Sequence, residues 1–90
     1  MGENQQQQIQ IRIPDGLRSG TYANHLVLSH TDHEFTLDFC AVLAHEDPSI
    51  RQAEVVARVV VAPTLVGTLL TALNDNLGKY ERQFGEVRRP

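Results

Sequence analysis

Hydrophobic and polar residues alternate in the first half of the chain with the period of a β-strand. In residues 8–13 every second residue is isoleucine, and Gln10 and Arg12 lie between the isoleucines. Period two with β-branched side chains predicts a half-buried strand, which the turn-forming residues Pro14, Asp15 and Gly16 end. The same pattern predicts three further strands, over residues 22–29, 34–43 and 53–61.

The last third of the chain changes to a helical period. Pro63 suits the first helical turn, where its missing N–H costs nothing, and Gly85 suits the end of a helix. Apolar residues between them recur at spacings of four and three and form a helix seam: Val66, Leu70, Leu73, Leu77, Tyr80 and Phe84. We therefore expect an α+β fold, a four-stranded antiparallel β meander followed by one long C-terminal amphipathic helix over residues 63–85.

The strand pattern also predicts which residues face each other. A two-residue turn at Thr31 and Asp32 would pair Leu28 with Phe35, Leu26 with Leu37 and His25 with Asp38. A loop centred near Pro48 would pair Phe35 with Val61, Leu37 with Val59, Phe39 with Ala57 and Asp38 with Arg58. The odd-numbered face is then continuously apolar, and a polar rung of His25, Asp38 and Arg58 is expected on the even-numbered face.

The face of the sheet that holds this polar rung also carries aliphatic residues, and we call it the valine face. In the expected register it includes Val27 of the second strand, with Val42, Val56 and Val60 of the two later strands. A sheet face exposed to water should be polar at such positions. One helix covers only one face, so a partner chain on the valine face is expected. The alternative is that these are scattered surface valines on a monomer.

A second pattern inside the predicted helix joins small residues at spacings of four, three and four. This small-residue stripe consists of Gly67, Thr71, Asn74 and Gly78. Each interior glycine costs about 1 kcal/mol relative to alanine. The stripe would permit a close crossing with another helix or with the sheet, including one from a second subunit. The alternative is that both glycines are tolerated imperfections.

Composition limits the function classes. The 90 residues suit one domain, over residues 8–87, with a disordered glutamine-rich tail at 1–7 and a short basic tail at 88–90. A net charge of −3 predicts no nucleic-acid footprint. The single cysteine, Cys40, excludes an intramolecular disulfide and suits the reducing cytoplasm. No apolar run is long enough for a membrane span, and the N-terminus lacks the features of a signal peptide.

The candidate chemistry is sparse. His30 and His33 flank a turn with Asp32 between them, and these residue types bind zinc or nickel, but no second cluster completes a ligand set. Cys40 is the nucleophile nearest to His25, and its expected neighbours are hydrophobic. Arg82, Arg88 and Arg89 are largely offset by Glu81 and Glu86. We therefore expect no enzyme activity, no metal and no cofactor.

Several motifs resemble a known family. They are residues 22–24, 34–39, 58–63 and above all 69–85, which ends in Lys79-Tyr80-Glu81 and Gly85. The chain, from about Ile9 to Val87, resembles the short bacterial and archaeal proteins of the domain of unknown function 3467 family, a resemblance that implies no activity. Ala62 stands where a threonine or serine N-cap is expected, which weakens the helix start by about 1 kcal/mol. The topology is also similar to that of the export chaperone SecB, whose subunits assemble as dimers of dimers, but a fold does not imply a function.

The expected function is that of a non-enzymatic oligomeric interaction protein. It would form a homodimer or a dimer of dimers and bind or scaffold other polypeptides, in the manner of a chaperone. The alternative is a nucleic-acid-binding or regulatory module that uses a dimeric sheet and the C-terminal arginines. A third, weaker alternative is a metal-dependent sensor at His30 and His33.

Overall fold

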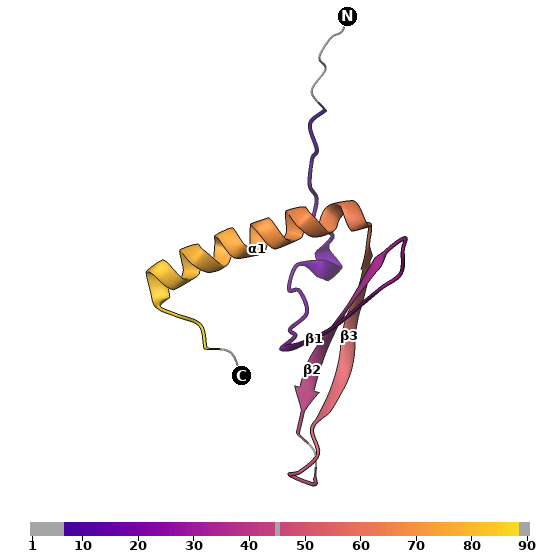
Figure 1. Ribbon diagram of the computed structural model, residues 1–90, viewed down its shortest axis with the longest axis vertical. Coiled ribbons are helices and arrows are strands. Elements are labelled where there is room, and N and C mark those ends of the chain that lie inside the picture. The colour runs from indigo at the N-terminus through magenta and orange to yellow at the C-terminus, as the bar shows by residue number, and fades with distance from the viewer. Residues whose placement is uncertain (1–6, 45, 89–90) are drawn as a thin grey trace, which may run out of the picture.

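A computed structural model, which describes residues 7–44 and 46–88, shows a small sheet joined to one long helix (Figure 1). The elements are the short 3-10 helix η1 (Asp15–Leu17), the strands β1 (His25–His30), β2 (Phe35–Leu43) and β3 (Gln52–Val61), and the helix α1 (Pro63–Phe84). The strands lie in the order β1-β2-β3, and both neighbouring pairs are antiparallel. The α+β class and the C-terminal helix are confirmed, whereas the described chain forms three strands rather than the expected four.

The expected first strand, segment 8–13, is extended but joins no sheet within the described chain. Its three isoleucines, Ile9, Ile11 and Ile13, are 86%, 84% and 60% exposed. Alternation suits a segment for pairing, but it becomes a strand only where it pairs with another strand. Pro14 instead leads into η1, and in Figure 1 the segment runs away from the sheet. Residues 1–6 of the expected disordered tail lie outside the described chain, and so do residues 89–90 of the basic tail.

The helix begins and ends at the residues that its sequence predicts. Pro63 is the first helical residue, and Ala62 caps the helix without a side-chain hydrogen bond. Gly85 follows the last turn with φ of 98°, a conformation that favours glycine, and its N–H donates to the carbonyl of Glu81 at 2.9 Å. The weak N-cap and the glycine stop are thus both present.

The pairing of β2 with β3 follows the expected register from Phe35 to Phe39. All four predicted pairs form: Phe35 with Val61, Leu37 with Val59, Phe39 with Ala57, and Asp38 with Arg58. A bulge then shifts the register between Phe39 and Cys40, so that Cys40 faces Val55. Val56 is the extra residue of the bulged strand, where two residues oppose one.

The expected register of β1 against β2 is wrong by two residues. Leu28 pairs with Leu37, and the residue opposite Asp38 is Val27 rather than His25. The turn residues are Asp32 and His33: the Thr31 N–H donates to the Glu34 carbonyl at 2.9 Å, and the Thr31 hydroxyl accepts from the His33 N–H at 3.1 Å. Because the slip is two residues, each side chain keeps its predicted face. The polar rung loses His25, which faces Cys40.

The core of the described chain is very small. Its buried residues are Leu37, Cys40 and Asp38, all on the central strand β2. None of the 22 residues of α1 is buried. The first three turns of the helix meet the odd-numbered face, where Val66, Leu69, Leu70 and Leu73 line an apolar cavity with Leu26, Leu28, Phe35 and Leu37. In Figure 1 the rest of α1 extends beyond the sheet.

Candidate interaction surfaces

The helix seam is an apolar surface of α1 that stays largely exposed. Its members Leu70, Leu73 and Phe84 are 63%, 59% and 66% exposed. Val66, Leu70 and Leu73 face the sheet across the apolar cavity, whereas Leu77, Tyr80 and Phe84 lie on the turns that extend past it. The rings of Tyr80 and Phe84 contact each other, with centroids 5.0 Å apart. An exposed apolar row of this kind is a candidate interaction surface.

The valine face is the second apolar surface, on the opposite side of the sheet. Val27 and Val60 are about half exposed, Val56 is exposed at the bulge, and Val42 is half-buried. Val55, which lies opposite Cys40, is also half exposed and joins this face. Sequence reasoning missed Val55 because the adjacent Val55 and Val56 fit either register, and the bulge decides between them.

An ion pair crosses the valine face between β2 and β3. The Arg58 guanidinium donates two hydrogen bonds to the Asp38 carboxylate, Nε to Oδ1 at 2.6 Å and Nη2 to Oδ2 at 2.9 Å. These hydrogen bonds, together with the Arg58 charge, hold the pKa of Asp38 below its usual value of 3.8, against the burial that raises it. Asp38 is therefore ionised at neutral pH and is poorly suited to accept or donate protons there.

Cys40 is buried next to this pair. Its thiol donates to the backbone carbonyl of Asp38 at 3.5 Å, and a backbone carbonyl does not act as a base toward a thiol. His25 lies opposite Cys40 in the ladder, but no hydrogen bond joins the two side chains in the described structure. The cross-strand neighbours of Cys40 are Val55 and His25, so the expectation of hydrophobic neighbours holds on the β3 side only. Its burial is typical of a structural cysteine.

The two glycines of the small-residue stripe have no backbone packed closely against them in the described chain. A Cβ built on Gly67 would meet nothing within 4 Å, and one on Gly78 would meet only the end of the Arg82 side chain at 3.4 Å. The expected crossing is therefore not made with this chain's own sheet. A crossing of Gly67, Thr71, Asn74 and Gly78 with a second subunit stays a prediction.

The histidines of the β1–β2 turn do not converge. The His30 ring stacks on Phe35 with centroids 5.3 Å apart, whereas His33 Nε2 lies 3.4 Å from Asp32 Oδ1 on the exposed turn. Across residues 7–44 and 46–88, no three His, Cys, Asp or Glu side chains gather closely enough to hold a metal ion. His45 lies outside the described residues.

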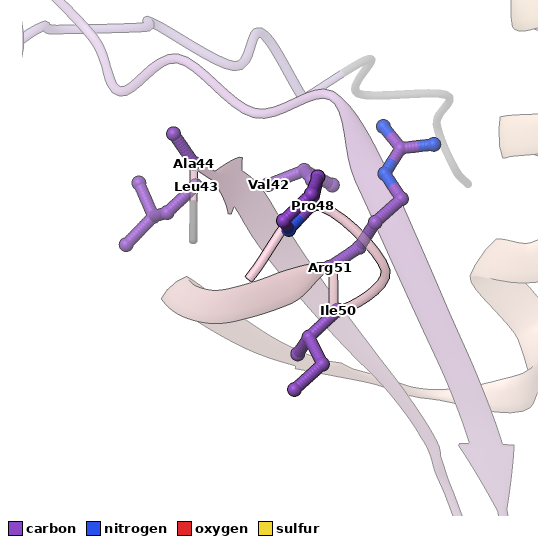
Figure 2. A pocket seen from close by; sticks show the side chains of 6 residues that line it. All are labelled: Val42, Leu43, Ala44, Pro48, Ile50 and Arg51. Atoms are coloured by element: carbon purple, nitrogen blue, oxygen red, sulfur yellow. The ribbon is translucent and has the colours of Figure 1, made fainter. Parts of the chain in front are cut away.

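The end of the β2–β3 hairpin forms a shallow hollow, shown in Figure 2. Asp47 shapes the turn, because its Oδ1 accepts hydrogen bonds from the N–H and hydroxyl of Ser49 at 2.9 and 2.7 Å. The hollow is lined by Val42, Leu43, Ala44, Pro48, Ile50 and Arg51, and the Arg51 guanidinium extends away from Leu43 and Ala44. Its lining holds one cation among apolar groups and no nucleophile or acid–base pair.

Comparison with known families matches residues 1–89 to the model described as protein of unknown function (DUF3467). The chain belongs to the DUF3467 family. The match confirms the resemblance carried by the motifs of β2, β3 and α1, and the DUF3467 description names no activity. No curated protein and no solved structure matches the chain. None of the helices in the described part of this DUF3467 protein is long and apolar enough to cross a membrane.

Proposed function

We propose that this DUF3467 protein is a non-enzymatic interaction protein, which assembles as a homodimer or higher oligomer and binds or scaffolds other polypeptides. The observation that carries the proposal is the exposure of the helix seam together with the small core: none of the seam residues is buried. Two apolar surfaces on opposite sides of one sheet would allow one to serve self-association and the other to bind a different polypeptide.

The surface area of a single chain supports assembly. The chain exposes 8622 Å², about 3,300 Å² more than the roughly 5,300 Å² typical of a folded monomer of its mass. The extended segment 8–13 contributes to this surplus. Obligate dimer interfaces bury about 2,000–5,000 Å² in total over two partners. Two copies together therefore expose enough surplus surface to form one.

Energetics points the same way. Fixing the backbone of each residue costs about 1–2 kcal/mol. Full burial of a large aliphatic side chain offsets about 1.5–3 kcal/mol of that cost. With Leu37 and Cys40 as the buried hydrophobic residues of the described chain, most of this stabilisation is missing from one copy. Burial of Leu73, Leu77 and Phe84 against a partner would supply part of it.

The test combines light scattering with polypeptide binding. We expect the wild-type protein to be a dimer or larger at micromolar concentration, and Leu77→Glu in the helix seam to weaken association at least about tenfold. Thr68→Glu is the matched control, because it places the same charge on the opposite side of α1. A wild-type monomer at micromolar concentration would contradict the assembly.

The binding arm uses a labelled, permanently unfolded polypeptide and a short DNA duplex, each followed by fluorescence anisotropy. We expect polypeptide binding that persists at high salt, because burial of apolar surface drives it. Binding to the duplex alone, with loss at high salt, would instead indicate the phosphate contacts of a nucleic-acid-binding protein.

A further inference from the structure

We propose that segment 8–13 of one copy adds as a fourth strand to the free edge of β1 in a second copy. The inference rests on the proposed self-association and specifies where the two chains meet. In Figure 1 segment 8–13 runs as an extended chain, and Ile9 and Ile11 are more than four-fifths exposed. No backbone hydrogen bond links residues 7–13 to the sheet within the described chain, so its donors and acceptors are available for pairing.

The edge of β1 offers the matching groups. The bond from the Thr31 N–H to the Glu34 carbonyl shows that odd-numbered residues of β1 turn their backbone groups toward β2. Leu26, Leu28 and His30 therefore turn theirs outward, to the uncovered edge. β1 has six residues, the same number as segment 8–13.

Side-chain chemistry selects an antiparallel register. Ile11 opposite Leu28 sets Ile13 opposite Leu26 and Ile9 opposite His30. The isoleucines then lie on the helix-side face of the sheet, beside Leu26 and Leu28, which are 48% and 57% exposed in one chain. Gln8, Gln10 and Arg12 fall on the other face. The added strand would therefore extend the apolar face that α1 only partly covers.

Charge distinguishes β1 from the other edge of the sheet. β3 carries Glu54 and Arg58, and charged residues are a common protection of edge strands against pairing. β1 (His25–His30) contains no Asp, Glu, Lys, Arg or Pro. Exchange of both segments across a twofold axis would close both β1 edges and leave no unpaired donor strand, which yields a closed dimer rather than a filament.

Cysteine cross-linking tests the pairing directly. The background is Cys40→Ala, which removes the native thiol. One preparation carries Ile11→Cys and a second, of different mass, carries Leu28→Cys; they are unfolded, mixed, refolded and oxidised. Opposite residues in a hydrogen-bonded pair lie about 5.5 Å apart, within reach of a disulfide. We expect a disulfide-linked product of mixed mass. Val60→Cys in place of Leu28→Cys is the matched control on β3.

Each other outcome overturns the inference. A third preparation carries both Ile11→Cys and Leu28→Cys in one chain. A cross-link that forms only within this chain would place segment 8–13 on its own β1. A mixed product with Val60→Cys and none with Leu28→Cys would place it on β3. Absence of every cross-link would show that the segment does not pair.

A second measurement does not depend on disulfide geometry. We expect Ile9→Lys combined with Ile11→Lys to weaken the dimer at least about tenfold. Gln8→Lys combined with Gln10→Lys adds the same charge on the other face and is expected to have little effect. If Leu77→Glu dissociates the dimer and the paired isoleucine changes do not, self-association stands and strand exchange is wrong.

Discussion

Asp38 is the buried polar residue of the described chain, beside the buried hydrophobic residues Leu37 and Cys40, and Arg58 supplies the counter-charge of its carboxylate. The two hydrogen bonds from the guanidinium satisfy both carboxylate oxygens. The Arg58 side chain is itself 65% exposed, so the pair lies at the border of the valine face and not inside a closed core. Removal of either partner leaves the other without its counter-charge at a site that a second polypeptide would cover.

We expect Arg58→Lys to lower the urea midpoint of unfolding, because a lysine ammonium keeps the charge but does not reproduce the bidentate geometry. Asp38→Asn should lower it further. Asp15→Asn is the matched control, since the pair between Asp15 and Arg18 lies on the surface with side chains 95% and 70% exposed. Equal effects at Asp15 and Asp38 would contradict a special role for the pair between Asp38 and Arg58.

The lowered pKa of Asp38 predicts an acid dependence of stability. A carboxyl group whose pKa is lower in the folded than in the unfolded protein stabilises the fold above its unfolded pKa. This contribution is lost as the pH falls through the folded pKa, below the usual value of 3.8. The difference in urea midpoint between wild type and Asp38→Asn should therefore shrink below about pH 4. A difference that stays constant from neutral pH to pH 3 would contradict the assignment.

For the small-residue stripe we expect substitutions to raise the stability of the protein and not to lower it. Gly67→Ala should raise the free energy of unfolding by about 1 kcal/mol, because alanine favours the helix and its Cβ meets open space in this chain. Gly78→Ala should act similarly, with a small movement of Arg82. Urea denaturation and light scattering on both variants check this. Loss of the dimer would show instead that the stripe packs closely against a second subunit.

At the scale of elements, α1 is regular along its length but lacks a side-chain N-cap. Ala62 is in the extended conformation of an N-cap, yet it offers no side-chain acceptor to the first-turn N–H groups. We expect Ala62→Ser to stabilise the protein by about 1 kcal/mol in thermal or urea unfolding. Ala62→Val, which has no acceptor, is the control. An equal gain for valine would attribute the effect to β-propensity at the end of β3 rather than to capping.

The sequence predicts the elements whose signals are long and local. The spacing of Val66, Leu70 and Leu73 identifies α1, and the alternation from Phe35 to Leu43 identifies β2. The register of β1 fails because the Thr31 hydroxyl moves the turn by one residue, a choice that hydrophobic pattern does not reveal. The hydrophobic pattern does not reveal the bulge at Val56 either, because Val55 and Val56 are both apolar. Segment 8–13 has the pattern of a strand, but whether it pairs also depends on the strand edge that it meets, which its own residues do not reveal.

At the scale of the whole molecule, the single chain is open. Its radius of gyration is 17.9 Å, against about 12 Å for a compact domain of its length, and the extended N-terminal segment accounts for part of the difference. The valine face, with Val27 and Val60, could be named as a candidate surface from the sequence. Leu77 belongs to a helix seam that the pattern leads one to expect against the sheet, whereas in the structure it is 43% exposed. Whether a second polypeptide covers these surfaces could not be predicted, because one chain's sequence does not describe a second surface.

Openness at this scale predicts that stability depends on protein concentration. If folding is coupled to dimer formation, each tenfold dilution should lower the apparent free energy of unfolding by about 1.4 kcal/mol. Urea denaturation at several protein concentrations, followed by far-ultraviolet circular dichroism, measures this shift. Leu77→Glu should reduce the dependence together with the stability. Superimposable curves for the wild type at all concentrations would mean that the monomer folds alone.

The short connection between β3 and α1 couples the direction of the helix to the end of the strand. Ala62 is the one residue between Val61 and Pro63, and the proline ring keeps it extended, at ψ of 145°. The joint therefore has little slack, and α1 turns with the end of the strand. A helix of 22 residues is about 33 Å long, so a 10° change of twist at the joint moves its far end by about 6 Å. A polypeptide that reshapes the sheet would in this way displace Phe84, well beyond its own contacts.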